Sequence, residues 1–408
     1  MSPGSRLPVR AEPWGAVLAL GITQITAWGS IYYLFALLME PLHSALGSGK
    51  SAIVGAFTVS LLVSGLLAPV VGRTIDRRGG RGLMAAGSLL AAVALAALGQ
   101  VTALWQLYVV WALLGAAMAG TLYEPAFAVL TRAFINNHRR AIAVLTLFGG
   151  FASTVFWPLG QALIDALGWR QTTLVFAAIN LLVCVPLHLF ALPAAQAPAA
   201  VPGAPTAAAQ SRSLTEALRD PTFHLLAGAF TINALVFSGM SVHLLAMLAA
   251  KGLSGVQAAA YGALIGPMQV LGRLVEMFFG QRIPPSRVGL IAMGLLPASL
   301  LVYAVAGSSA WSFVLFAALF GSGNGVMTIV RGTVPMELYG REHYGAVNGA
   351  MAAPVLIAKA AGPLVAALAW SAVGDYDAVA LLLGALALFS LVFFGFAVRS
   401  RAGAAGRR

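Results

Sequence analysis

Long apolar runs recur along the whole chain, and they constrain its fold more than any other feature of the sequence. A run of about 20 apolar residues is long enough to cross a bilayer as an α-helix. Hydrophobic residues make up 60% of the chain and charged residues only 9%, whereas about 25% of the residues in a soluble domain are charged. Membrane β-strands would be about half as long and would alternate in polarity. The sequence therefore predicts an all-α, polytopic membrane protein. We count twelve candidate spans, at 14–39, 51–71, 82–100, 105–130, 141–164, 170–192, 222–249, 254–279, 287–306, 310–330, 344–370 and 378–398.

The start of the chain and its single cysteine narrow the class further. Residues 1–13 lead directly into a full-length span, so we expect no cleaved signal peptide. Cys184 lies inside the sixth span, which excludes an internal disulfide; we interpret it as a small buried apolar residue. The sequence has no phosphate-binding G-x-x-x-x-G-K-[ST] motif and no cluster with metal-ligand spacing. We therefore expect no cofactor, no metal and no enzymatic activity.

The net charge of +12 follows from membrane topology. With a cytoplasmic N-terminus, nineteen Lys and Arg residues, Arg331 among them, fall in cytoplasmic segments and only three on the opposite face. This asymmetry is the positive-inside pattern, so we expect no nucleic-acid partner. The predicted location is a bacterial-type cytoplasmic (inner) membrane, with both termini in the cytoplasm. The two remaining basic residues, Arg273 and Lys359, fall inside spans.

An Ala/Pro-rich segment near the middle divides the chain into two halves. The stretch "PAAQAPAAVPGAPTAAAQSRS", residues 193–213, contains no aromatic residue and is typical of a flexible linker. We predict a six-helix half over 1–192, a cytoplasmic linker over 193–221 and a second six-helix half over 222–408. Two such halves are typical of facilitator-type transporters, although periodicity alone leaves an unrelated channel or transporter open.

The segment "GRTIDRRGGRGLM", residues 72–84, follows the second span. It resembles the signature of the major facilitator superfamily between its second and third helices, roughly G-x-x-x-D-R-x-G-R-R. The resemblance implies a twelve-helix transporter whose loop latches the cytoplasmic side. An aspartate here can face a helix N-terminus or pair with a neighbouring arginine. Gly80 stands where an arginine is usual. The matching residues are Gly72, Asp76, Arg77, Gly79 and Arg81.

Lys359 is the most deeply placed charge in the predicted spans. It lies about 20 Å along the eleventh span, with Pro354 on one side and Gly362-Pro363 on the other. A charge near the centre of a membrane helix costs about 2.5–3.5 kcal/mol, so such a residue faces a cavity or a partner. We predict a role in substrate binding or coupling; a structural salt bridge is the alternative.

Arg273, Glu276 and Glu124 are the other charges inside spans. Arg273 and Glu276 lie three residues apart on one helix face. Arg273 suits an anion anchor because its planar fork binds a carboxylate through two bonds; a local ion pair with Glu276 is the alternative. Glu124 and Glu276 are candidates for a coupling proton, or Glu124 pairs with an arginine. Two cations and two carboxylates cancel when all are ionised, so an anion site requires one glutamate to be protonated or remote.

The first span supports a narrower resemblance. Its stretch "AWGSIYYLFALLMEPL" is similar to the monocarboxylate-transporter branch, which includes the bacterial oxalate:formate antiporters. That branch implies an arginine in the eighth helix and, in the antiporters, a lysine in the eleventh, both of which hold substrate carboxylate. Arg273 and Lys359 occupy these positions. Gln269 stands where animal carriers have an aspartate, so their proton-coupling scheme is not implied here.

Three further residues are candidates for substrate contact. Tyr32 and Tyr33 in the first span could form an aromatic wall, with ordinary packing as the alternative. Asn233 in the seventh span could touch substrate, or form a hydrogen bond between helices.

The leading hypothesis is a secondary transporter that moves a small organic anion, a mono- or dicarboxylate, by alternating access. Proton symport and anion exchange both remain open. The expected partners are the anion, protons and membrane lipid, and the fold usually acts as a monomer. The alternative is an exporter of amphiphilic drugs or metabolites. In "WALLG", Trp111 replaces the fourth-helix arginine of drug:proton antiporters, which counts against that alternative. A membrane sensor with a transporter fold is a third possibility.

Overall fold

The computed structural model describes residues 12–194, 211–305 and 309–405, and in these ranges the chain is entirely helical and turn. The predicted all-α class is therefore confirmed. Eleven helical segments in these ranges are long and apolar enough to cross a membrane.

Breaks and short π-helical turns divide several of these segments. In the first half, the helices are α1 (Trp14–Ala27), the π-helix η1 (Trp28–Tyr33), α2 (Leu34–Leu46), α3 (Lys50–Arg78), α4 (Arg81–Leu98), α5 (Leu104–Thr121), α6 (Tyr123–Ala133), α7 (His138–Gly150), α8 (Ala152–Leu167), α9 (Trp169–Ile179) and the π-helices η2 (Asn180–Cys184) and η3 (Leu187–Ala191). The helices that follow are α11 (Leu214–Arg219), α12 (Pro221–Ala250), α13 (Gly255–Ala263), α14 (Ile265–Phe279), the 3₁₀-helix η4 (Gly280–Arg282), α15 (Pro285–Val305), α16 (Ala310–Tyr339), α17 (Tyr344–Val373) and α18 (Tyr376–Ala405).

Eleven of the twelve predicted spans coincide with helical segments that are long enough to cross a membrane, although several contain a break or a π-turn; the eighth consists of two shorter helices. The predicted run 254–279 forms α13 and α14, which meet at Leu264. Each of the two is shorter than a spanning helix. The eighth span is therefore present as a broken helix, and its second part, α14, carries Arg273 and Glu276.

Several helices continue well beyond the predicted ends of their spans. The predicted tenth span ends at residue 330, but α16 continues to Tyr339. The prediction that Arg331 lies in a cytoplasmic loop is therefore wrong. An apolar run marks only the lipid-compatible part of a helix, whereas the hydrogen-bonded helix continues past a charge that faces other protein. Similarly, α3 continues through the motif to Arg78, and Gly79 ends it with φ of 78°.

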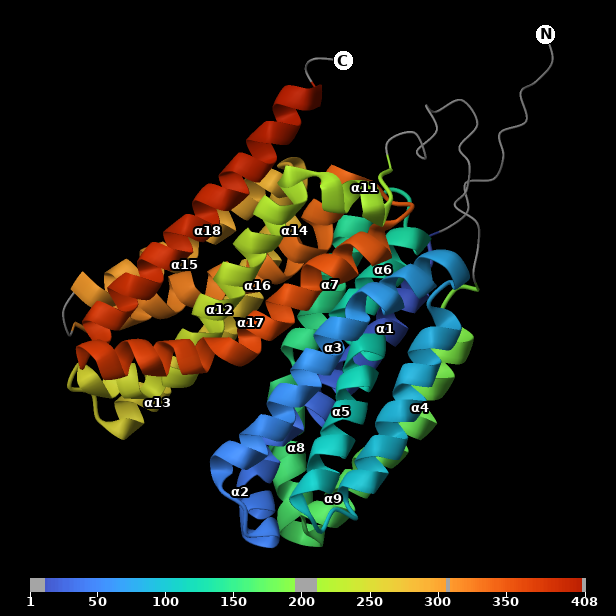
Figure 1. Cartoon of the computed structure of the whole chain (residues 1–408), viewed down its shortest axis with the longest axis vertical. Coiled ribbons are helices and arrows are strands. Elements are labelled where there is room, and N and C mark those ends of the chain that lie inside the picture. Colours follow the sequence, from blue (N-terminus) through green and yellow to red (C-terminus); the bar gives the residue numbers. More distant parts are fainter. Residues whose placement is uncertain (1–11, 195–210, 306–308, 406–408) are drawn as a thin grey trace.

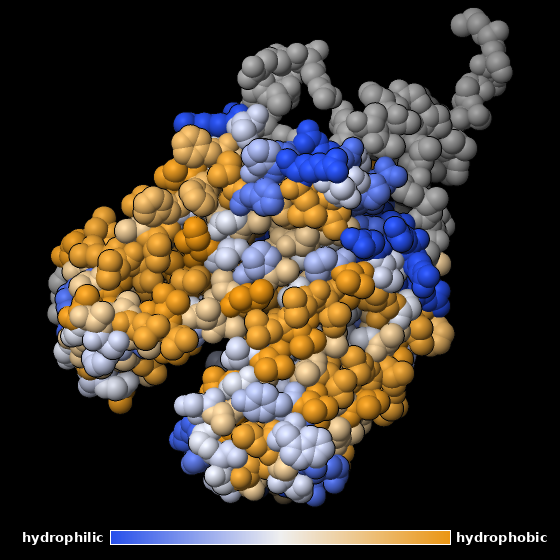
Figure 2. Space-filling model, in the orientation of Figure 1, coloured by the Kyte–Doolittle hydropathy of each residue, from blue (hydrophilic) through white to orange (hydrophobic). Residues whose placement is uncertain are grey.

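The helices form two bundles that meet at one end and separate at the other (Figure 1). The first bundle contains the helices from α1 to η3, and the second contains α12 to α18. They meet at the end near α11 and the C-terminal end of α18, which we call the basic end because Arg77, Arg78 and Arg140 lie there. Figure 2 shows a hollow between the bundles at the opposite end, which we call the open end.

The two bundles touch backbone to backbone along α3 and α17. A Cβ added at Gly72 would overlap the carbonyl group of Gly345, and one added at Gly349 would overlap the backbone of Ala68. Small residues let membrane helices approach this closely. This contact fixes α17 beside the motif helix at the basic end.

The predicted linker is described only in part. Residues 195–210 of it lie outside the described ranges. Its last part contains α11, whose N-terminus is closed by a capping box in which Ser213 and Glu216 bond to each other's backbone N–H groups. That part of the predicted linker is therefore helical. The division into 1–192, 193–221 and 222–408 remains a prediction.

Candidate functional site

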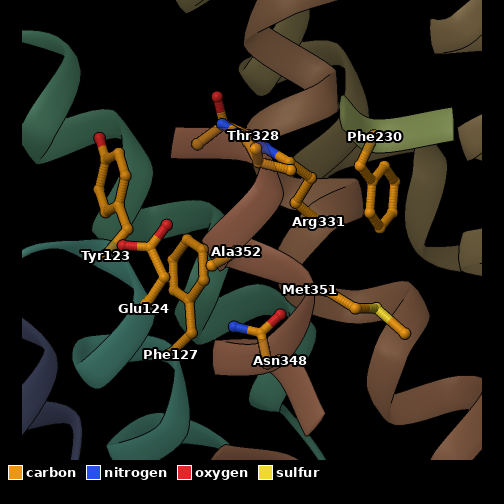
Figure 3. Close-up of a pocket in the computed structure, with 10 residues that line it drawn as sticks. Tyr123, Glu124, Phe127, Phe230, Thr328, Arg331, Asn348, Met351 and Ala352 are labelled. Atoms are coloured by element: carbon orange, nitrogen blue, oxygen red, sulfur yellow. The ribbon is translucent and has the colours of Figure 1, made fainter. Parts of the chain in front are cut away.

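A small pocket that contains both charged and apolar side chains lies between the two bundles (Figure 3). Its volume is about 20 Å³, which is enough for about one water molecule. Glu124 and Arg331 enter it from opposite bundles. The pocket is lined by Tyr123, Glu124 and Phe127 of α6, Phe230 of α12, Thr328 and Arg331 of α16, and Asn348, Met351, Ala352 and Val355 of α17.

Glu124 reaches the pocket because the fourth span breaks just before it. Leu122 adopts an extended conformation between α5 and α6, so Glu124 falls in the first turn of α6, where a helix dipole favours a carboxylate. Pro125 has no N–H and leaves the Thr121 carbonyl without its usual helical donor. The Gln24 amide takes that place, since its Nε2 donates to Thr121 O at 2.6 Å.

Arg331 is the functional candidate that sequence reasoning missed. It lies eight residues before the end of α16, so it is about 12 Å inside the helix. The signal was present in "RGTVPMELY", where small and apolar residues resume after the arginine. Its side chain is half-buried. Within the described ranges, neither Arg331 nor Glu124 has a side-chain hydrogen bond or ion pair with another protein group.

Lys359 extends the pocket face of α17 toward the open end. Asn348, Ala352 and Val355 line the pocket, and Lys359 follows one turn later at helical spacing. Lys359 is half-buried, and the charges that act on its ammonium group are Arg331 and Glu124. No hydrogen bond or ion pair of this ammonium group occurs among the described residues. Three charges from both bundles thus face one region.

The charges of α14 join the two bundles, and Glu276 does so at the basic end. Arg139 of α7 contacts the Glu276 carboxylate through Nε and Nη2, both at 2.7 Å from Oε1. Arg139 Nη1 also donates to Ile283 O at 2.6 Å. The predicted local pair of Arg273 with Glu276 is not formed, because the carboxylate pairs with Arg139 of the opposite bundle.

Arg273 also crosses between the bundles, and its partners are backbone carbonyls. Its Nη1 donates to Thr146 O at 2.8 Å, and its Nε donates to Gly325 O at 3.4 Å. Thr146 lies close to the C-terminal end of α7, where the helix dipole favours a positive charge. The absence of a side chain at Gly150 leaves room for the guanidinium.

The motif aspartate completes this interface. Asp76 accepts hydrogen bonds from the backbone N–H groups of Gly345 at 2.9 Å and Ala346 at 2.7 Å, in the first turn of α17. Arg341 donates to Ile135 O of the first bundle at 2.7 Å. Asp76 therefore faces a helix N-terminus, and Arg132 also lies beside it, since the Arg132 Nη1 donates to the Asp76 backbone carbonyl. We call the bonds of Asp76, Arg139, Arg273, Glu276 and Arg341 the basic-end contacts.

Comparison with known proteins identifies the family of a chain with this architecture. Residues 17–296 match the sequence profile described as Major Facilitator Superfamily. The chain belongs to the major facilitator superfamily. It is therefore a multi-pass membrane protein and a secondary transporter of a small-molecule substrate, not an enzyme.

The relatives of this transporter include an uncharacterized protein, a monocarboxylate transporter and an efflux pump. It is 28% identical over 264 residues to an uncharacterized 38 kDa protein of Thermoproteus tenax, covering 64% of this chain and 65%, just under two thirds, of that protein. It is 28% identical over 362 residues to human monocarboxylate transporter 11, covering 83% and 73% of the two chains. It is also 27% identical over 314 residues to an MFS-type efflux pump of Mycolicibacterium smegmatis, covering 72% and 71%.

Two solved structures share the fold of this transporter. The human organic anion transporter MFSD10 (TETRAN) has a TM-score of 0.72 and 20% identity, covering 95% of this chain and 100% of that chain. The E. coli fucose:proton symporter FucP has a TM-score of 0.73 and 15% identity, covering 94% and 98%. At these identities the likeness concerns the fold.

The predicted aromatic residues of the transporter lie beside the pocket. Tyr32 and Tyr33 belong to η1, with ring centroids 5.3 Å apart. Trp28, in the same turn, packs on Tyr123 of the pocket at 5.1 Å. Arg331 acts electrostatically on Tyr32, and Arg273 on Tyr33. The first bundle therefore presents aromatic rings opposite the cations of the second.

The remaining predicted residues lie further from the pocket. Gln269 is half-buried on α14, where its backbone packs against Gly325. Asn233 is buried on α12. Arg77 is exposed and Arg81 is half-buried at the basic end. The structure thus brings Glu124, Lys359 and the tyrosines toward one region and places Glu276 at the basic end. Arg273 lies between the two, since it bonds across the interface while its charge acts on Tyr33, Tyr123 and Arg331.

Proposed function

We propose that this transporter moves a small organic anion, a mono- or dicarboxylate, which Arg331 and Lys359 bind between the two bundles. The observation that carries the proposal is the charge balance of the site. Arg331 and Lys359 face a single carboxylate, Glu124, while Glu276 is remote and neutralised by Arg139. An anion site required one of the two glutamates to be protonated or remote, and Glu276 is remote. Charged groups inside a membrane protein line a substrate path or meet a partner, and a carboxylate supplies the missing partner.

The geometry favours a small anion. The pocket of about 20 Å³ is too small for an organic acid, so the substrate body occupies the hollow beyond it. There one carboxylate reaches Arg331, whose planar fork suits bidentate binding. Lys359, further toward the open end, holds a second carboxylate or the other oxygen of the first. Tyr32 and Tyr33 close the opposite side.

Arg273 enters this proposal as a group that changes partners. With the basic end closed, its donors point to the carbonyls of Thr146 and Gly325. When the bundles rock and the basic end opens, the bond to Thr146 breaks and the guanidinium becomes free to meet the anion. Gln269 and Asn233 are placed to contact the substrate only in that state.

The coupling and orientation follow from the same arrangement. Glu124 faces Arg331 without a bond, so it is the preferred proton carrier for symport; anion exchange results if Glu124 stays ionised throughout. We place the basic end in the cytoplasm of a bacterial-type inner membrane by the positive-inside rule. The structure then corresponds to an outward-open state of a single-chain transporter whose halves are 1–192 and 222–408.

The named relatives support two versions of the proposal. Monocarboxylate transporter 11 favours an anion substrate, and it aligns with 83% of this chain. The MFS-type efflux pump favours the second candidate, export of an amphiphilic compound. In that version the unpaired cations of the site would have no anionic ligand to meet, so the charge balance favours the first.

The test is counterflow in proteoliposomes with a panel of labelled mono- and dicarboxylates. We compare the wild type with Arg331→Gln, Lys359→Gln and Arg273→Gln. Matched controls are Arg287→Gln and Lys50→Gln, which change exposed cations outside the site. The proposal expects one or more anions to exchange, Arg331→Gln and Lys359→Gln to abolish exchange, and both controls to transport normally.

Two results would contradict the proposal. If no anion in the panel is exchanged by folded protein, the anion substrate is wrong and export of amphiphiles takes its place. If anions exchange normally in Arg331→Gln and Lys359→Gln, the substrate class stands and the assigned site is wrong.

A further inference from the structure

The turn of α17 that carries Lys359 has a broken backbone hydrogen bond. Pro363 lies four residues after Lys359, inside a helix that runs continuously from Tyr344 to Val373. A proline has no N–H, so it leaves the carbonyl four residues earlier without its helical donor. The carbonyl in question is that of Lys359 itself. An unsatisfied carbonyl inside a membrane protein is costly, so a donor from elsewhere is expected.

Ser238 of α12 supplies that donor. Its hydroxyl donates to the Lys359 carbonyl at 2.7 Å. The close approach that this bond needs is provided by two glycines, because a Cβ added at Gly239 would lie only 2.7 Å from the Gly362 carbonyl oxygen. One turn further on, His243 Nε2 lies 3.2 Å from Pro363 O. The α12 helix therefore holds α17 at the very turn that carries the charge.

The first bundle uses the same device beside its own site charge. Pro125 frees the Thr121 carbonyl, and Gln24 of α1 takes that carbonyl at 2.6 Å, next to Glu124. In each bundle, a proline removes one backbone donor from the helix that bears a site charge. A polar side chain from the first helix of that bundle then completes the lost bond. The repetition with unrelated residue types indicates that holding these turns serves the site.

We propose that Ser238 is a positioning residue that fixes Lys359 in the hollow and so sets the transporter's affinity for its carboxylate substrate. The basic end of α17 is already held by Asp76 at Gly345 and Ala346. Ser238 provides a second fixed point, and between the two the helix face from Asn348 to Lys359 keeps its register toward the pocket. The inference about affinity rests on the proposed function; the inference about position does not.

The position is tested with thiol chemistry, because the chain has one cysteine, Cys184, which is fully buried. We replace Lys359 by cysteine (Lys359→Cys) and measure its modification by sulfonatoethyl methanethiosulfonate, an anionic reagent suited to a site that contains Arg331. The same variant is then combined with Ser238→Ala, with Ser238→Thr, and with Ser299→Ala. Ser299 is a matched control, because it is a buried serine of the same bundle whose hydroxyl bonds within its own helix at 2.7 Å to Leu296 O.

The expected result is a lower modification rate with Ser238→Ala, a rate restored by Ser238→Thr, and no change with Ser299→Ala. In the chain that keeps Lys359, Ser238→Ala should raise the apparent KM for the exchanged anion about tenfold, or about 1.4 kcal/mol, because a displaced ammonium group makes a weaker charge-assisted contact with the anion. The maximal rate should change little. A general loss of folding would lower both the rate and the thermal midpoint, and Ser238→Thr would then not restore a KM effect selectively.

The outcomes separate this inference from the proposed function. If Lys359→Cys is modified and the anion protects it, but Ser238→Ala behaves like Ser299→Ala, the positioning role is wrong and the proposed site stands. If Ser238→Ala lowers modification while no carboxylate is transported, the positioning role stands and the proposed function is wrong. If Lys359→Cys is not modified at all, Lys359 does not face the hollow and both fall.

Discussion

The basic-end contacts and the pocket both place charges between the two bundles, but they satisfy those charges differently. At the basic end, Glu276 pairs with Arg139, Arg273 donates to carbonyls and Asp76 accepts from backbone N–H groups. In the pocket region, Glu124 and the two cations of the opposite bundle have no such bonds among the described residues. A charge removed from water needs partners. At the basic end, the protein supplies these partners itself, and the bonds close that end. In the pocket, the ligand and water have to supply them.

This difference predicts that substitutions will separate stability from transport. Changes at the basic end should alter the balance between closed and open conformations. Changes in the pocket should alter substrate binding while the fold keeps its stability. Four substitutions, taken from the largest expected effect to the smallest, test this separation.

The largest effect is expected from Glu276→Leu. This change leaves Arg139 as an unpaired buried cation at the interface, which costs about 3–5 kcal/mol. We expect the closed basic end to open, which cross-linking of cysteine pairs across that end would measure. The double variant Arg139→Leu with Glu276→Leu is the control, because an apolar pair of similar volume is nearly neutral. If the double variant is as open as the single one, the pair does not hold the interface.

Arg331→Gln should show the opposite behaviour. Arg331 has no hydrogen-bond or ion-pair partner to lose in the part of the chain that the structure describes, so the thermal midpoint should remain within a few degrees of the wild type. Substrate affinity should fall by about 1.5–3 kcal/mol, the range for a charge-assisted hydrogen bond. Binding by calorimetry or scintillation proximity measures this loss. A large drop in the thermal midpoint with unchanged affinity would show that Arg331 stabilises the fold and does not bind substrate. The pocket would then not differ from the basic-end contacts in this respect.

Gln24→Leu tests whether the break in the fourth span depends on the hydrogen bond from Gln24 to the Thr121 carbonyl. The Thr121 carbonyl would lose its donor beside Pro125, at a cost of about 1–3 kcal/mol. Because Glu124 follows this break, we expect both a lower thermal midpoint and an altered pH profile of transport. Gln24→Glu in its protonated form, measured at low pH, should recover part of the activity by donating again. An unchanged pH profile in Gln24→Leu would show that the break between α5 and α6 keeps its geometry without the hydrogen bond from Gln24.

The smallest effect is expected from Asp76→Asn. The amide oxygen can still accept from one N–H of α17, but the charge at the helix N-terminus is lost, which costs about 0.3–2 kcal/mol. Cross-linking at the basic end should show a modest shift toward the open form. Asp375→Asn is the matched control, since Asp375 accepts from the backbone N–H groups of Asp377 at 3.1 Å and Ala378 at 3.3 Å, in the first turn of α18 within the second bundle. Equal shifts in both variants would indicate a general loss of stability rather than a weaker interface.

The sequence was sufficient for the fold and for part of the site. Apolar length alone located the eleven segments that are long and apolar enough to cross a membrane, as well as the run that forms α13 and α14, and helix spacing placed Lys359 and Glu124 inside helices. It failed at Arg331, because a charge ends an apolar run even where the hydrogen-bonded helix continues. It also failed to find the partner of Glu276. Spacing along one helix reveals only neighbours such as Arg273, whereas Arg139 comes from another bundle and is brought near only by the packing of two bundles.

The contact of Gly72 with Gly345 has a consequence for turnover. A transporter must separate and rejoin this surface in every cycle, and surfaces joined by interlocking side chains would need rotamer changes each time. Two bare stretches of main chain can part and meet again without such changes, so the contact adds little barrier to the rocking step. Because the two backbones are in direct contact, this surface has no room for an added side chain. A single methyl group at Gly72 would hold the helices apart, and a protein altered in this way should spend its time facing one side of the membrane.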